Sequence, residues 1–125
     1  MEKMLEDRET PFTDFRVYDF NGVPRAVFDR LTPEQNSLLS HFLYPSRAYI
    51  DSLYKDTLKV KSGELKQVVF EDDLVKANFG PRDLVIEMKR VEGVTNKHFM
   101  MKLPAIDARY LLLKWKFECI RWGTP

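Results

Sequence analysis

The sequence predicts an α+β fold: a single compact domain of antiparallel β-hairpins, two helices that meet at a corner and a C-terminal helix. Three observations predict it: turn residues between alternating apolar and polar segments, one strong helix-start signal, and helix-end signals around the apolar C-terminal segment. A chain of 125 residues with 44% hydrophobic residues can bury one core but not two. We expect residues 1–12 to form a flexible N-terminal arm and residues 13–125 to form the domain.

The first hairpin is predicted on both sides of Asn21-Gly22. Residues 14–20 alternate apolar with polar side chains, and residues 23–28 return after the turn. Asn-Gly is the strongest short hairpin signal because both residues tolerate positive φ angles. Since Pro24 lacks a donor N–H, the returning strand is expected to lie at a sheet edge or to begin late.

A corner of two helices is predicted next. Thr32 can accept hydrogen bonds from the first turn of a helix, Gln35 can reach back to Thr32, and Pro45 ends the helix. Ser46 can cap a second helix over residues 47–56, and the short break between the helices predicts an angle between them. These helices are expected to pack into the core through the apolar residues Leu38, Leu39, Phe42, Leu43, Ile50, Leu53 and Tyr54.

A second hairpin is predicted from residues 58–61 and residues 65–70, with Ser62-Gly63 as its turn. Residues 71–82 show no clear period and are expected to form a loop.

A third hairpin is predicted from two further apolar segments. Residues 83–91 contain a β-branched core, and residues 97–103 return as a short strand. Residues 93–96 have turn composition and are expected to join the two strands.

The C-terminal segment, residues 104–122, fits both a strand and a helix. Four apolar residues alternate with charged ones at the period of a strand: Leu113, Trp115, Phe117 and Cys119. However, Pro104 suits the first turn of a helix, Gly123 suits the position after its end, and few residues between them are β-branched. These end signals favour the helix, with Trp115 and Cys119 on a common buried face.

A helical wheel gives this C-terminal helix two apolar faces. The first face holds Ala108, Leu111, Leu112, Trp115, Cys119 and Trp122, and the second holds Ile106, Tyr110, Leu113, Phe117 and Ile120. A small domain can usually cover only one face of such a helix. The second face is therefore a predicted partner-binding surface, with Tyr110, Leu113, Phe117 and Ile120 as its contact residues.

The composition predicts a cytoplasmic protein that does not enter a membrane. The N-terminal residues are charged throughout, and no apolar run approaches the roughly 18 residues that span a bilayer. The single Cys119 cannot form an internal disulfide, and its apolar neighbours indicate a reduced, buried thiol. Residues 1–80 carry 11 basic and 14 acidic side chains, whereas residues 81–125 carry 9 basic and 5 acidic ones, which is a modest basic excess.

One charged pattern resembles a metal-dependent nuclease site. Asp72 or Asp73 is followed on a predicted strand by Glu87 and, two residues later, Lys89. Over residues 46–90 this order of an acid, a gap and Glu-x-Lys is similar to nucleases of the restriction-endonuclease-like class. The resemblance implies that the acids share a divalent cation while Lys89 orients the attacking water.

The same residues also fit an exposed sheet face with a cross-strand charge pair, and this is what we expect. We therefore predict no catalytic residue, metal or cofactor. His41 and His98 have no further His or Cys at metal-ligand spacing, so they are expected to be structural or surface residues.

Two binding functions remain. Nucleic-acid binding is the alternative, because basic residues that can hold phosphates alternate with aromatic ones in the last third. Its candidate residues are Lys89, Arg90, Lys97, Lys102, Arg109, Lys114 and Lys116. The leading hypothesis is a non-enzymatic interaction or assembly component, such as part of a viral assembly, that binds a protein partner or a second copy through the C-terminal helix.

Overall fold

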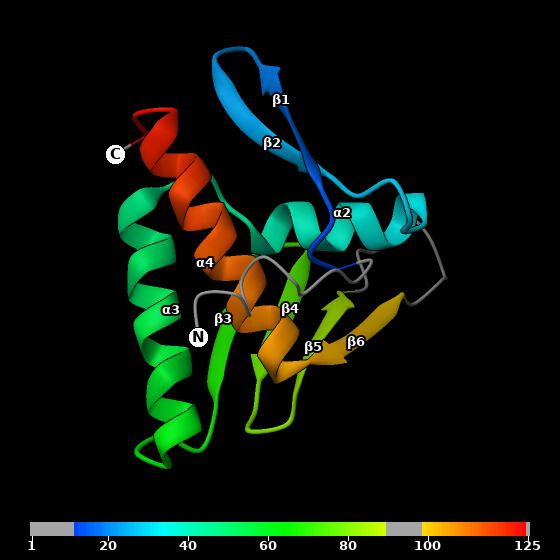
Figure 1. Ribbon diagram of the computed structural model, residues 1–125. Coiled ribbons are helices and arrows are strands. Elements are labelled where there is room, and N and C mark those ends of the chain that lie inside the picture. The colour runs from blue at the N-terminus through cyan, green and yellow to red at the C-terminus, as the bar shows by residue number, and fades with distance from the viewer. Residues whose placement is uncertain (1–11, 90–98, 125) are drawn as a thin grey trace.

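The computed structural model describes residues 12–89 and 99–124 and confirms the α+β fold (Figure 1). Its elements in chain order are β1 (Arg16–Phe20), β2 (Val23–Val27), α2 (Pro33–Phe42), α3 (Arg47–Ser62), β3 (Val68–Glu71), β4 (Val75–Phe79), β5 (Asp83–Met88), β6 (Met100–Pro104) and α4 (Ala105–Arg121). Strands β1 and β2 form a two-stranded sheet, and strands β3 to β6 form an antiparallel sheet in sequential order. The hairpin of β1 and β2 extends from one end of the molecule, beyond the C-terminal end of α4 (Figure 1).

Alternation along the four-stranded sheet determines which face is buried. Phe79, Leu84 and Leu103 occupy one register row across β4, β5 and β6, and all three are buried. Their sequence neighbours point to the opposite face, because successive side chains of a strand alternate. The three helices α2, α3 and α4 all pack on the buried face. The structure therefore has one helical layer and one sheet layer, with the core between them.

The first hairpin is confirmed. Asn21 and Gly22 have φ angles of 55° and 85°, the pair of positive values required by a type I′ turn. Pro24 lies within β2, and this sheet has only two strands, so a proline is tolerated at its free edge.

The predicted helix corner is also confirmed at both caps. Thr32 and Gln35 form a reciprocal capping box, and the Ser46 hydroxyl accepts a hydrogen bond from the Tyr49 N–H. The break between α2 and α3 covers residues 43–46, as predicted.

The predicted second hairpin is wrong. Helix α3 continues to Ser62 rather than ending near residue 56, because Thr57 and Val60 extend the buried stripe of Ile50 and Leu53 at helical spacing. Gly63 has a φ angle of 87° and its N–H bonds to the Val60 carbonyl, so Ser62-Gly63 is the end of a helix rather than a hairpin turn.

The loop predicted over residues 71–82 is wrong as well, since it contains β4. Strand β3 pairs with β4 through a short turn at Asp72. Val75, Ala77 and Phe79 are buried in alternation with more exposed residues, which is the period of a strand. In the third hairpin, β5 and β6 pair as predicted, while the turn at residues 93–96 lies outside the described residues.

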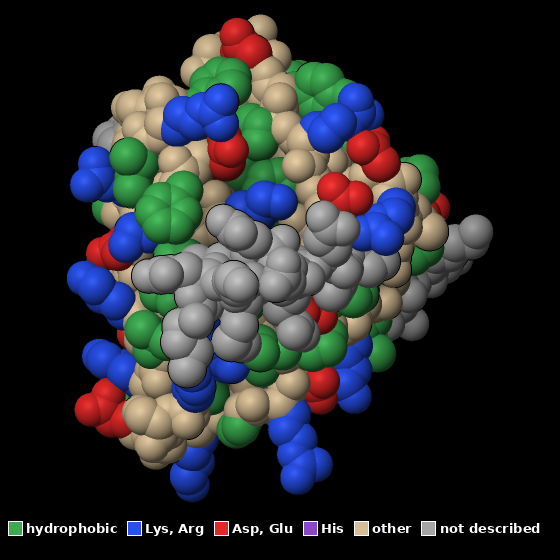
Figure 2. All heavy atoms as spheres, viewed as in Figure 1, with side chains coloured by type: hydrophobic (Ala, Val, Ile, Leu, Met, Phe, Trp, Pro, Cys, Tyr) green, Lys and Arg blue, Asp and Glu red, His purple; other side chains and the backbone are tan. Residues whose placement is uncertain are grey.

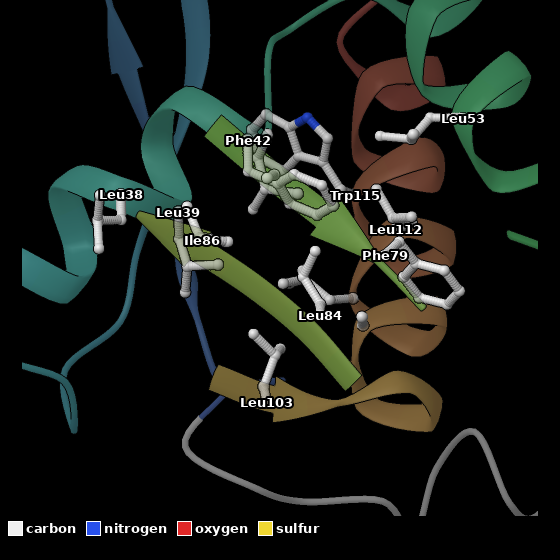
Figure 3. Packing of buried hydrophobic residues seen from close by; sticks show 14 of the residues in the cluster. Leu38, Leu39, Phe42, Leu53, Phe79, Leu84, Ile86, Leu103, Leu112 and Trp115 are labelled. Carbon is white, nitrogen blue, oxygen red and sulfur yellow. The ribbon is translucent and has the colours of Figure 1, made fainter. Parts of the chain in front are cut away.

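Residues 105–121 form the predicted helix, α4, and its first apolar face fills the core. Trp115 points between α2 and the sheet, toward Phe42, and its indole N–H donates to the Tyr44 carbonyl at 3.3 Å (Figure 3). Trp115 and Cys119 are both fully buried, as predicted. Trp122 was also assigned to this face, but it lies just past the helix end and remains 37% exposed.

Burial raises the pKa of the Cys119 thiol. Among residues 12–89 and 99–124, no helix is both long and apolar enough to cross a bilayer.

Candidate functional site

The second apolar face of α4, here called the outer face, consists of Ile106, Tyr110, Leu113, Phe117 and Ile120. The intervals between these residues are four, three, four and three positions. This is the spacing of the a and d positions in a coiled-coil heptad, which places all five side chains along one line of the helix. The outer face therefore has the geometry of a helix–helix contact line.

Exposure rises toward the C-terminal end of the outer face. The Phe117 side chain is 58% exposed and Ile120 is 41% exposed, while Ile106, Tyr110 and Leu113 are half-buried. Single exposed apolar residues are common on protein surfaces, whereas neighbouring ones indicate an interaction site. Tyr110, Leu113, Phe117 and Ile120, the four predicted contact residues, thus share one surface.

Basic side chains flank the outer face on both sides. The helical period places Lys114 and Arg121 along one side and Arg109 and Lys116 along the other. These are the positions that flank the a and d residues of a coiled coil and set partner choice.

Several of these basic side chains contact α3 or the residues just before β1. Lys116 Nζ lies 2.6 Å from Asp51 Oδ1, and Lys55 Nζ lies 3.0 Å from Asp51 Oδ2. Hydrogen bonds from Lys116 and then Lys55 lower the pKa of the Asp51 carboxyl. Desolvation by burial lowers the pKa of Arg109, which lies on the same side.

Lys114 contacts the residues before β1. Its Nζ donates to the Thr13 carbonyl at 2.7 Å and lies 4.7 Å from the centre of the Phe15 ring. Arg121 lies 3.5 Å from Glu118, one turn away on the same helix. The outer face is thus apolar along its centre, with basic residues along both edges, of which Lys116 and Arg121 are paired with acids.

Comparison with known proteins assigns no relative. No family model matches the chain, and no curated protein or solved structure matches it significantly. The site is therefore interpreted from its own residues.

The nuclease candidates lie in the β3–β4 turn (Asp72 and Asp73), on β5 (Glu87) and just after β5 (Lys89). Asp72 forms the turn, with its Oδ1 accepting from the N–H groups of Leu74 and Val75 and its Oδ2 lying 3.3 Å from His41 Nδ1. Burial opposes the charge of Asp72, but these backbone hydrogen bonds and His41 together lower the pKa of its carboxyl. Asp73 is exposed in the same turn.

The other two members of that pattern face different neighbours. Glu87 lies opposite Lys76 on β4, as expected for a cross-strand charge pair. Lys89 Nζ lies 2.7 Å from Glu71 Oε2 and donates to the Asp72 carbonyl. In the part of the chain that the structure describes, no three His, Cys, Asp or Glu side chains lie close enough to hold a metal ion.

The candidate nucleic-acid residues are spread over the sheet and over different sides of α4. Lys89 is paired with Glu71, Lys102 lies 3.4 Å from Asp83, and Arg109, Lys114 and Lys116 flank the outer face. Arg90 and Lys97 lie outside the described residues. On the face seen in Figure 2, hydrophobic and acidic side chains separate the basic ones. Nucleic-acid binding stays a prediction.

One candidate site was missed from the sequence. A hollow of about 210 Å³ lies between the β1–β2 hairpin and the C-terminal end of α2. Its lining residues are Phe20, Val23, Pro24, Arg25, Ala26, Ser40, His41, Leu43 and Pro45. The sequence predicted the hairpin and the helix separately, but no local pattern indicates that they pack beside each other.

Proposed function

We propose that the protein is a non-enzymatic assembly component that binds a partner through the outer face of α4. The observation that supports this proposal is the line of five apolar residues at heptad spacing, ending in the exposed Phe117 and Ile120. Large apolar and aromatic residues of this kind contribute most to the affinity of protein interfaces.

The partner that we propose is a second copy of the chain. Two copies of α4 can pack side by side along this line, because each presents a line of apolar residues from Ile106 to Ile120, which is about four turns of the 17-residue helix. A two-fold arrangement needs only one surface patch that is complementary to itself. The basic edges would then face each other and weaken the contact at low ionic strength.

Sedimentation velocity over a range of protein concentrations tests this proposal. We expect wild-type protein to associate reversibly and Phe117→Asp to stay monomeric, because a charge on the contact line would have to be desolvated. Leu58→Asp is the matched control, since Leu58 is also an exposed apolar helix residue but lies on α3. This control should associate like wild type.

Two outcomes contradict the proposal. One is a wild type that stays monomeric up to about 1 mM, a concentration at which even a weak interface is half occupied. The other is a Phe117→Asp variant that is folded and associates as strongly as Leu58→Asp.

A further inference from the structure

The outer edge of β2 presents backbone groups that a further strand could bind. The two-residue turn makes Phe20 and Val23 a hydrogen-bonded pair, and pairs alternate along an antiparallel ladder. Pro24 therefore occupies a position whose N–H is not needed for pairing with β1. By the same alternation, the N–H and C=O groups of Ala26 point away from β1.

A side chain of α2 already binds this edge two residues further on. The Phe28 N–H donates to Asn36 Oδ1 at 2.7 Å, and Asn36 Nδ2 donates to the Phe28 carbonyl at 2.9 Å. The Asn36 amide thus takes the place that a peptide group of a neighbouring strand would occupy. These two bonds show that the N–H and C=O groups of Phe28, two residues after Ala26, point away from β1, which fits the alternation along β2.

The hollow described above lies beside this edge. Pro24 and Ala26 line it from β2, and Leu43 and Pro45 line it from the end of α2 and the following residues. In the described part of the chain, no further strand pairs with this edge of β2. An apolar side chain of an added strand would therefore have an apolar hollow to enter, while its backbone bonds to Ala26.

One charge beside the β2 edge, that of Arg25, favours an acidic residue in the added strand. Arg25 lies on the hairpin face opposite to Pro24 and Ala26, and its guanidinium group is 5.2 Å from the centre of the Phe20 ring. His41 is the other basic residue, and its Nδ1 lies 3.3 Å from Asp72. No Asp or Glu is found among the described residues that line the hollow. A carboxylate placed opposite Arg25 would complete a charge pair across the strands.

We propose that the β2 edge binds an extended segment of a partner protein as a third strand, with the pattern apolar, acidic, apolar. The two apolar residues enter the hollow opposite Pro24 and Ala26, and the acidic residue between them lies beside Arg25. This site is separate from the outer face of α4, so either proposal can fail alone.

The test is a titration of the isotope-labelled full-length protein with a blocked peptide, acetyl-Thr-Val-Glu-Val-Thr-amide, followed by amide NMR. We expect the Ala26 amide signal to shift and its hydrogen exchange to slow, because the peptide backbone accepts from it. The same peptide with Lys in place of Glu should bind at least about tenfold more weakly.

Variants of the protein separate charge recognition from loss of fold. Arg25→Glu should reverse the order of affinity, so that the Lys peptide binds more tightly than the Glu peptide. Arg25→Gln should make the two peptides bind equally. Lys66→Glu makes the same charge change at an exposed residue between α3 and β3, and should leave the order as in wild type. The amide spectrum of each variant reports whether it is folded.

Three results would overturn the proposal: no binding of the Glu peptide, shifts that map to α4 rather than to β2 and α2, or an unchanged peptide order in folded Arg25→Glu.

Discussion

The two apolar faces of α4 have similar composition and very different surroundings. On the first apolar face, here called the inner face, Leu111, Leu112 and Trp115 are fully buried, and Figure 3 shows Leu112 and Trp115 in the core. The outer face carries comparable side chains, yet Phe117 is 58% exposed. The spacing of apolar residues along a helix therefore predicts an apolar face, but it does not predict what packs on that face. Whether that contact lies within the domain is determined by the rest of the fold.

The largest expected effect is on stability, and the two tryptophans of the chain measure it, since Trp115 lies in the core and Trp122 at the exposed end of α4. Trp115→Ala should lower the free energy of unfolding by about 3–5 kcal/mol, because it leaves a cavity in the core and removes the bond to the Tyr44 carbonyl. Guanidinium unfolding followed by circular dichroism measures the change.

Trp122→Ala is the matched control at the exposed end of the same helix. Its side chain is 37% exposed, so the free energy of unfolding should fall by less than in Trp115→Ala, about 1–2 kcal/mol. Equal destabilisation by the two variants would show that the end of α4 is part of the core.

Ionic strength should affect association through the outer face. Basic residues line both of its edges, and they would face the same edges of a second copy. Salt screens this repulsion, so the association constant should rise a few-fold between about 50 mM and about 500 mM NaCl. Sedimentation equilibrium measures it. Weaker association at high salt would indicate a partner held by opposite charges instead.

A smaller effect concerns the contact that fixes Lys116 at the edge of the outer face. Because hydrogen bonds from Lys116 and Lys55 lower the pKa of Asp51 in the folded state, the contact stabilises the fold above the pKa of an unfolded Asp, about 3.9. That stability is lost as pH falls through the lower folded pKa. Asp51→Asn should therefore lose less stability than wild type between about pH 4 and pH 2.

Urea unfolding at a series of pH values measures the slope of the unfolding free energy against pH. Lys116→Gln should also make this slope shallower than in wild type. An unchanged slope in both variants would show that the contact contributes nothing to the acid response.

The smallest expected effect is at Glu87, on the exposed face of the four-stranded sheet. Glu87→Gln should change the free energy of unfolding by less than about 1 kcal/mol, because Glu87 lies opposite Lys76 in the sheet and a charge pair across strands contributes little. We also expect no cleavage of DNA or RNA by wild type with Mg²⁺ or Mn²⁺. Metal-dependent cleavage that is lost in Glu87→Gln would favour the nuclease hypothesis.

Three of the elements that the sequence predicts correctly are marked by turn or cap residues. Thr32 and Pro45 enclose α2, Asn21-Gly22 closes the first hairpin, and Pro104 and Gly123 enclose α4. In α4 these end signals outweighed an internal alternation typical of a strand.

Two elements were assigned wrongly because short patterns are ambiguous. Leu58 and Val60 alternate with lysines and fit a strand, but Val60 also continues the helical stripe from Ile50, and packing of α3 on α4 decides between them. Strand β4 was missed although Val75, Ala77 and Phe79 alternate, because acidic residues and Gly80-Pro81 on either side resembled a loop.

The outer face of α4 could be predicted from the sequence because it lies on one helix. The hollow beside β2 could not, because it forms only where the first hairpin meets the end of α2, and that arrangement depends on the whole core.

The central claim is that the outer face of α4 contacts the same face of a second copy, and thiol cross-linking at Leu113 tests it most directly. Leu113 is the middle residue of the five, so it lies near its own counterpart in either a parallel or an antiparallel pair. Mild oxidation of Leu113→Cys, quenched before denaturation, should give a covalent dimer on a non-reducing gel. Wild type, whose Cys119 is buried, and Leu58→Cys should remain monomeric. A monomeric Leu113→Cys, or equal cross-linking of Leu58→Cys, would contradict the claim.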